Sequence, residues 1–518
     1  MGRHPEPLFP QAVLDALGQA PGSPAFEHGP RTVTRGELLD LIGRLSLALR
    51  AAGLGPGQGM AIRTRVTPEA FAAHLAAHVV GCRVVGIRPG YPPAQLAHVL
   101  GTGVAAIVVD PETATPELRR AAGPIPLLSL GPCAGPADLV AEPVDLLAEP
   151  GGAGVPVVTA RPDDVAALHF TSGSTGRPKG CAITYAALGA HWAWQPRRWG
   201  PAATAFAAAF QRYLLFGTLA SMVVLEFLAP CLLGGGTAVI PDDEGTDDRP
   251  MFPYAIERHR ITGSIITVPR LYRMLHLLRE DPGVDLGSLR ALMVSGSPIS
   301  PSRLAAATEL LGPVVYQGYG QTEAGSITML TPADLRRDPE RALASVGRPH
   351  PGVELSVRDD EGEPLPTGAA GEIHVRSPYL MAGYWGADEE SPLRDGWLRT
   401  RDLGHLDEQG FLHLSGRSRD VIMVNAMVVY AGPIERALVR HPDVEEAYVA
   451  GAPDERRGEA VHAFVVPAAG RVPDRAALAE LVRDELGDDS VPSTFTVVPA
   501  VPVAEGGKPD KRALLDLL

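Results

Sequence analysis

The stretch Thr171-Ser172-Gly173-Ser174-Thr175-Gly176-Arg177-Pro178-Lys179-Gly180 directly follows a short apolar run, Ala166 to Phe170. Its backbone N–H groups and hydroxyls can face phosphate oxygens, and Lys179 adds a positive charge. Glycine also permits a close approach of the backbone to a ligand. The spacing from Gly173 to Lys179 excludes a Walker A motif. Because linkers share this composition, both a phosphate-binding loop and a flexible linker stay open at this point.

The sequence around this stretch alternates between helical and strand patterns, which predicts a layered α/β unit with largely parallel strands. Thr34 is the expected N-cap of the first long helix. The Pro- and Gly-rich part from Gly131 to Pro162 indicates a connector. The predicted helices are Thr34 to Ala52 and Pro68 to Val80, and the predicted strands are Gly59 to Arg63, Arg83 to Ile87 and Ala105 to Val109.

The pattern changes after Pro351, where Val353 to Val357 and Gly371 to Val375 predict antiparallel strands joined by turns. A smaller unit that mixes helices and strands begins at about Ser418. We therefore expect a large N-terminal domain, residues 1–417, of layered α/β subdomains plus a β-rich subdomain. A small α+β domain, residues 418–518, is expected to follow.

Composition argues against several classes of protein. The formal net charge of −14 over 518 residues argues against a nucleic-acid surface. The N-terminus lacks the apolar segment of a signal peptide, and the four cysteines are interpreted as reduced thiols. The apolar run Thr218 to Ile240 contains Glu226 and Pro230, which predicts a buried helix and a strand rather than a membrane span. The expected location is cytoplasmic, with no nucleic-acid or membrane partner; the oligomeric state stays open.

His74 and His78 lie four residues apart on a predicted helix, as metal ligands can. The glutamate that a zinc-protease motif places beside the first histidine is missing. We interpret them as packed or exposed helical histidines.

The glycine-rich stretch resembles the phosphate loop of the AMP-forming adenylating enzymes, a superfamily with acyl-CoA synthetases, nonribosomal adenylation domains and firefly-type luciferases. Further matches follow in the order of that superfamily and span nearly the whole chain. They are Tyr316 to Glu323, Gly371-Glu372, Gly383-Tyr384, Asp395 to Gly404, Gly416-Arg417 and Gly506-Gly507-Lys508.

The resemblance implies an enzyme that uses ATP and Mg²⁺ to convert a small-molecule acid to an acyl-AMP, with a mobile C-terminal domain. Attack of a carboxylate on the α-phosphorus joins two anions, so cations and oriented donors are needed there. The implied catalytic residues are Lys508, Thr322 and Glu323, the implied metal ligands are Glu323 and Thr171, and the implied hinge residue is Arg419. The implied nucleotide-binding residues are Thr171, Ser172, Gly173, Ser174, Thr175, Gly176, Lys179, Gly296, Ser297, Gln317, Gly318, Tyr319, Gly320, Asp402 and Arg417.

Departures from the family pattern concentrate on the side of the second substrate. Arg401 replaces the glycine that usually precedes the ribose-binding aspartate, and Ala426 and Val428 replace a glycine and a cation in the segment that lines the thioester-forming site. The ATP-side residues are intact. Adenylation is therefore predicted more firmly than transfer to CoA.

The acid pocket is expected to be lined partly by Phe206 to Glu226, a mostly apolar stretch that favours an aryl or alkyl acid. No aspartate there can hold an α-ammonium group. The first hypothesis is a ligase that passes the acyl group to the thiol of CoA or of a carrier-protein phosphopantetheine. The second is a relative with a non-thiol acceptor, either an amine or, in bacterial secondary metabolism, ATP-dependent nitrite activation and diazotisation of an aryl amine. The third is a non-catalytic nucleotide-binding relative, against which Lys508, Glu323 and Asp402 argue.

Overall fold

The computed structural model describes residues 7–132, 144–147, 156–171, 178–241, 249–296, 299–386, 391–417, 421–424, 427–454, 458–503 and 509–518. For residues 417, 421, 423, 427, 428, 458 and 489 only the backbone is described.

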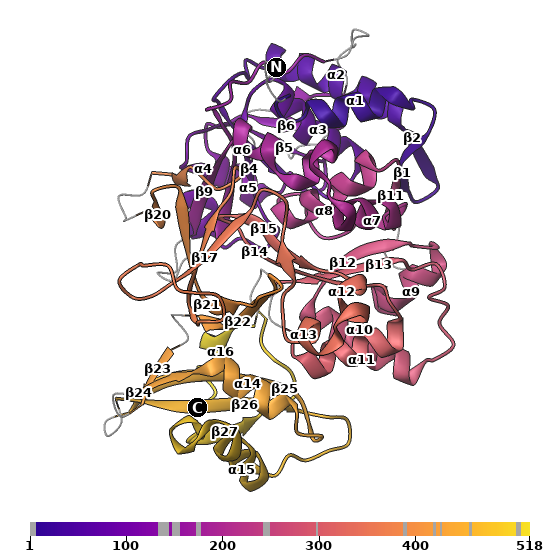
Figure 1. The fold of residues 1–518 in the computed structure, drawn as a ribbon. Coiled ribbons are helices and arrows are strands. Elements are labelled where there is room, and N and C mark those ends of the chain that lie inside the picture. The colour runs from indigo at the N-terminus through magenta and orange to yellow at the C-terminus, as the bar shows by residue number, and fades with distance from the viewer. Residues whose placement is uncertain are drawn as a thin grey trace.

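Over the described ranges, the strands form four sheets, of which the two largest, sheets I and II, stand in the upper part of Figure 1. The pairs in the middle of both sheets are parallel and the pairs at the edges include antiparallel ones, which confirms the predicted layered α/β class. Sheet I has the order β16 (Arg348–Pro349), β15 (Gly325–Leu330), β14 (Val315–Gln321), β13 (Ala291–Ser295), β12 (Gly263–Thr267), β10 (Arg212–Leu214), β11 (Thr237–Ile240), β1 (Pro24–His28), β2 (Arg31–Thr34). Sheet II has the order β19 (Gly383–Tyr384), β9 (Lys179–Thr184), β8 (Val165–Thr171), β4 (Arg83–Gly86), β3 (Gly59–Arg63), β5 (Val104–Val109), β6 (Leu127–Ser129), β7 (Val144–Asp145).

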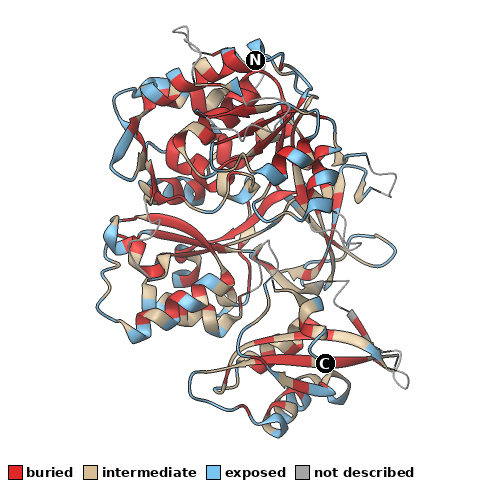
Figure 2. Ribbon diagram, turned by 180° about the vertical axis from the view of Figure 1, so that it is seen from behind, coloured by how far each residue is buried: buried red, intermediate tan, exposed pale blue. Residues whose placement is uncertain are grey.

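Helices α1, α2, α3 and α8 belong to the core that sheets I and II share, and the buried segments of Figure 2 run through these layers. Alternate residues of the strands serve different cores, because side chains of a strand point to opposite faces in turn. Ala291 and Met293 of β13 face the shared core, whereas Leu292 and Val294 pack in a core with α9, α10 and α11. The helices and 3₁₀ segments of this part are α1 (Gln11–Gln19), α2 (Arg35–Ala51), α3 (Pro68–Val79), α4 (Pro93–Leu100), α5 (Pro116–Ala122), α6 (Tyr185–Ala190), η1 (Trp192–Trp194), η2 (Pro196–Arg198), α7 (Pro201–Ala209), α8 (Met222–Leu233), α9 (Met251–Arg258), α10 (Val268–Glu280), α11 (Pro301–Leu311), α12 (Pro332–Arg337) and α13 (Pro339–Leu343).

Two local predictions are confirmed. Thr34 caps α2 in a reciprocal arrangement with Glu37, whose carboxylate accepts from the Thr34 backbone N–H at 2.7 Å. The apolar run after Thr218 folds as the buried helix α8, a glycine turn and β11. In that turn Gly236 is required, because a Cβ would overlap the carbonyl oxygen of Phe210.

After Pro351 the chain adds β19 to sheet II and otherwise forms sheets III and IV, which confirms the β-rich part and the smaller α+β unit. The predicted boundary between residues 417 and 418 adjoins residues outside the described ranges and stays a prediction. Sheet III contains β17 (Glu354–Arg358), β18 (Gly371–Arg376), β21 (Trp397–Leu406), β20 (Leu393–Arg394) and β22 (Leu412–Arg417). Sheet IV contains β24 (Met427–Tyr430), β23 (Val421–Val424), β26 (Gly458–Pro467), β25 (Val444–Asp454) and β27 (Thr494–Val497), accompanied by α14 (Ala431–Val439), α15 (Arg475–Leu486), η3 (Asp488–Ser490) and α16 (Lys511–Leu515).

Arg303 of α11 links the C-terminal unit to the rest of the molecule. Its guanidinium lies 2.8 Å from the carboxylate of Glu445 and donates to the Glu445 carbonyl oxygen at 2.5 Å. Both contacts join α11 to the start of β25, so the unit is held by a directed ion pair as well as by packing.

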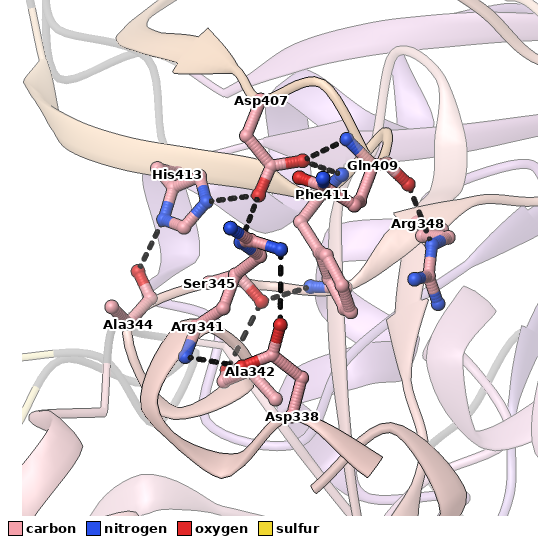
Figure 3. A network of polar contacts seen from close by, with 11 residues as sticks. Asp338, Arg341, Ala342, Ala344, Ser345, Arg348, Asp407, Gln409, Phe411 and His413 are labelled. Atoms are coloured by element: carbon pink, nitrogen blue, oxygen red, sulfur yellow. Dashed lines mark hydrogen bonds and ion pairs between the residues drawn. The ribbon is translucent and has the colours of Figure 1, made fainter.

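A polar network fixes the turn between β21 and β22 (Figure 3). One carboxylate oxygen of Asp407 accepts from the backbone N–H groups of Gln409 and Phe411, each at 2.9 Å. The other lies 3.1 Å from Nε2 of His413 and 3.2 Å from Nε of Arg341. Burial raises the pKa of Asp407, but the hydrogen bonds from His413 and from the turn outweigh it, so the pKa lies below its ordinary value.

We expect Asp407→Asn to lower the free energy of unfolding by about 2 kcal/mol, because the charge-assisted bonds to His413 and Arg341 are lost. Urea denaturation measures this loss. Since a lowered pKa adds stability that disappears as the pH falls through it, the difference from wild type should shrink in acid. The exposed Asp360→Asn is the control, and equal losses in both variants would contradict the role of the network.

Candidate active site

The two ends of the glycine-rich stretch lie opposite each other in sheet II. Thr171 ends β8, Lys179 begins β9, and they are partners in this antiparallel pair. The predicted phosphate-binding residues Ser172, Gly173, Ser174, Thr175 and Gly176 lie outside the described residues. The stretch is thus a connection anchored on two sheet strands at both ends.

Lys179 and Glu323 both lie next to Tyr384. The ammonium group of Lys179 lies 5.3 Å from the centre of the Tyr384 ring, and the Tyr384 hydroxyl donates to a Glu323 carboxylate oxygen at 2.9 Å. Burial, and then the negative charge of Glu323, raise the pKa of Tyr384, so its hydroxyl keeps its proton. Tyr384 therefore connects the phosphate-side lysine with the predicted metal ligand.

Tyr319 and Asp402 are in direct contact although they belong to different sheets. The Tyr319 hydroxyl of β14 donates to a carboxylate oxygen of Asp402 on β21 at 2.7 Å. Asp402 is buried, with 5% of its surface exposed, and its backbone N–H donates to the Thr400 hydroxyl. A hydrogen bond therefore links the predicted adenine contact to the predicted ribose contact.

The glycines on either side of Tyr319 allow neighbouring atoms to approach the backbone of β14 closely. A Cβ at Gly318 would lie 3.2 Å from Sδ of Met293, and one at Gly320 would overlap the carbonyl oxygen of Gly325. Gly296, at the end of β13, has a φ of +96°, which favours glycine. Gln317 is buried beside them, and its Oε1 atom has no hydrogen-bond donor in the described part of the chain. Such an acceptor is suited to a ligand donor.

The remaining predicted residues are placed less fully. Thr322 lies half-buried in the turn after β14, next to Glu323. The backbone of Arg417 pairs with Asp402 across β21 and β22, but its side chain is not described. Ser297, Arg419 and Lys508 lie outside the described residues, so their roles stay predictions.

Arg401 explains one departure from the family pattern. Its φ of +63° lies in the left-handed region, which favours glycine, the residue that the family has at this position. The chain keeps the backbone geometry before Asp402 with a larger residue.

The site has a suitable oxygen ligand for Mg²⁺. Among the described residues, no group of three or more His, Cys, Asp or Glu side chains can hold a metal ion. Mg²⁺ in nucleotide enzymes needs no such cage, because one carboxylate, water and substrate phosphates complete its shell. Glu323 can supply this carboxylate ligand through the oxygen that does not accept the hydrogen bond from Tyr384.

Sequence reasoning missed Tyr384 as a site residue, although the Gly383-Tyr384 pair was recognised as a motif. It also missed a cavity lined by His74, His169, His191 and Glu226. The carboxylate inside an apolar run was the signal for this cavity, because such a group needs a partner or a ligand.

The chain belongs to the AMP-binding enzyme family: the family profile matches residues 14–385, and the profile of the AMP-binding enzyme C-terminal domain matches residues 433–508. It is an AMP-forming ligase, as the names of its relatives also indicate. It is similar to the solved structure of the amide bond synthetase McbA from Marinactinospora thermotolerans, at 36% identity, a TM-score of 0.84, and 98% and 99% coverage of the two chains.

Two curated relatives are named as CoA-ester-forming enzymes. The medium/long-chain-fatty-acid–CoA ligase FadD8 of Mycobacterium tuberculosis is 32% identical, with 97% of this chain and 88% of the relative covered. A feruloyl-CoA synthase from an Amycolatopsis species is also 32% identical, with 94% of each chain covered. Within the described ranges, no helix has both the length and the apolar character needed to cross a bilayer.

Proposed function

We propose that this protein activates an aryl or alkyl carboxylic acid as an acyl-AMP and transfers the acyl group to an amine, forming an amide. The contact between Tyr319 and Asp402 supports the first half of this proposal, because it brings the predicted adenine and ribose contacts together from two sheets. The second half is supported by the likeness to an amide bond synthetase over nearly the whole chain.

In the first step, a carboxylate oxygen of the acid bonds to the α-phosphorus of ATP while the bond to pyrophosphate breaks. Tyr319 would contact adenine, Asp402 would accept from the ribose hydroxyls, and Lys179 would pair with phosphate oxygens. Lys508 would neutralise the charge shared by the carboxylate and the α-phosphate. Mg²⁺ held by Glu323 would supply positive charge to the phosphates.

In the second step, the amine nitrogen attacks the acyl carbon, the bond to AMP breaks, and the nitrogen loses a proton. A thiol acceptor would need space for the long pantetheine arm beside the segment from Met423 to Pro433. In that segment Ala426 and Val428 replace the usual glycine and cation. An amine is smaller and needs no such channel.

CoA or a carrier-protein thiol is the second candidate acceptor. It is supported by the names of the curated relatives, which include CoA ligases and a fatty acid–acyl-carrier-protein ligase from Streptomyces coeruleorubidus that is 30% identical over 96% of this chain.

The test incubates the protein with ATP, Mg²⁺ and a panel of aryl and alkyl acids, alone or with an amine, CoA or pantetheine. Pyrophosphate and AMP are quantified, and products are identified by mass spectrometry. We expect pyrophosphate with the acid alone and an amide when an amine is added. A thioester in preference to an amide would favour the second candidate, and the absence of pyrophosphate with every acid would overturn adenylation. Nitrite with an aryl amine is included to detect diazotisation.

A further inference from the structure

A cavity is lined by residues of α3, β8 and α8 and by residues in and next to η1. Its volume is about 50 Å³, several times the roughly 10–15 Å³ that one water molecule occupies on the same measure. The wall is mostly apolar, with polar side chains from several elements. The polar residues that matter here are His74, His169, His191, Glu226 and Tyr379.

The polar neighbours of Glu226 lie at one of its two carboxyl oxygens. The side chain is 4% exposed, and Trp192 Nε1 donates to its Oε1 atom at 3.1 Å. His191 Nε2 lies 3.6 Å from the same oxygen; its Nδ1 atom accepts from the Ala193 backbone N–H, so Nε2 carries the proton. The second carboxyl oxygen of Glu226 has no hydrogen bond to any described residue. When Glu226 is ionised, this oxygen is the acceptor that remains for a ligand.

The other walls supply no cation. Burial lowers the pKa of His74 to about 3, of His169 to about 4 and of His191 to about 3, and it places the pKa of His78 well below its ordinary value. These rings are therefore neutral at physiological pH. Both ring nitrogens of His74 are buried without a partner among the described residues. Buried polar groups without partners are costly unless a ligand satisfies them.

The cavity adjoins the predicted nucleotide site. Its lining includes Gly325, two residues after Glu323, and His169, two residues before Thr171. A Cβ at Gly325 would lie 2.7 Å from Nε2 of His191, so glycine preserves this part of the wall. An acid with its carboxylate near Glu323 can therefore extend into the cavity.

We propose, on the basis of the proposed function, that the cavity receives the end of the acid substrate remote from its carboxylate, where Glu226 accepts a hydrogen bond from an N–H group. The N–H belongs either to an aromatic ring or to an ammonium group. The substrate class is thus an acid with a distal N–H donor, and Glu226 determines that specificity.

The test compares acids that differ only at the donor: an indole carboxylic acid with its benzofuran isostere, and an aminomethyl benzoic acid with its ethyl isostere. Pyrophosphate release, measured above pH 8 so that Glu226 is ionised, gives kcat/KM for each acid. In wild type we expect kcat/KM to be ~10-fold or more higher for at least one N–H acid than for its isostere. The pair that shows this difference identifies whether the donor is a ring N–H or an ammonium group. Glu226→Gln should lose this preference, because its amide cannot accept from both Trp192 and the substrate.

The pH profile is a second readout. Burial raises the pKa of Glu226 to about 8, and its carboxylate form accepts more strongly than its neutral form. The kcat/KM for the N–H acid should therefore rise with pH through this pKa in wild type, relative to its isostere, and stay level in Glu226→Gln.

Glu309→Gln on the exposed surface of α11 is the matched control and should behave as wild type. Retained turnover of the isostere shows that Glu226→Gln is folded. An unchanged N–H preference in Glu226→Gln would overturn this inference while adenylation stands. If Glu226→Gln changed the KM for the amine and left the KM for the acid unchanged, this result would also overturn the inference. Failure of every acid in wild type would instead overturn the proposed function.

Discussion

Replacement of Lys508 by alanine is expected to lower the rate of acyl-AMP formation by roughly 10²- to 10³-fold, the usual effect of removing one charge-stabilising group. The reaction brings a carboxylate against the α-phosphate, and the lysine is the predicted cation between them. ATP affinity should change little, since the adenosine contacts and the phosphate loop stay in place. Pyrophosphate release measures the rate, and calorimetry with ATP alone measures the affinity.

Lys511→Ala is the matched control in the same C-terminal segment. Lys511 forms an ion pair with Glu435 at 3.2 Å, and partly exposed pairs of this kind contribute little. Its turnover should stay near that of wild type. If Lys508→Ala turned over at the wild-type rate, the lysine would be removed from the mechanism.

Asp402→Asn is expected to raise the KM for ATP by roughly 10-fold or more, because hydrogen bonds to a charged group contribute about 1.5–3 kcal/mol. Asparagine keeps the shape of aspartate and can still accept from Tyr319. Its amide nitrogen, however, presents a donor to ribose hydroxyls that should be donating. The KM for the acid should change less, and steady-state kinetics at saturating acid separates the two.

Asp395→Asn serves as the control, because this exposed residue has a φ of +52°, a conformation that asparagine tolerates. Tyr319→Phe removes the hydroxyl that orients Asp402 and should give a smaller rise in the KM for ATP. An unchanged KM in Asp402→Asn would show that the ribose is held elsewhere.

The sequence predicted the local features well, because capping, periodicity and motif order act over short distances. The cap at Thr34 and the buried helix after Thr218 needed only neighbouring residues. The contact between Tyr319 and Asp402 joins residues 83 positions apart on different sheets, so it depends on how sheets I and III meet. No periodicity encodes that arrangement.

The same limit applies to His74 and His78. Their spacing identified a helix but not which of its faces is covered. The helix α3 lies between two sheets and is buried nearly all round, so both rings are inside the protein. Likewise, the left-handed backbone conformation of Arg401 could not be predicted from the sequence, because arginine rarely adopts it.

The position of the cavity has an evolutionary consequence. His74 and Glu226 come from α3 and α8, and His191 directly precedes η1; none of these three elements carries a residue predicted to bind ATP. After a gene duplication, substitutions of these wall residues can therefore change which acid the enzyme accepts, while the reaction with ATP is inherited unchanged. Since the same side chains fill the space between two sheets, such exchanges are limited to residues of similar volume. Substrate diversity in such a lineage would grow through small, size-matched steps rather than through remodelled loops.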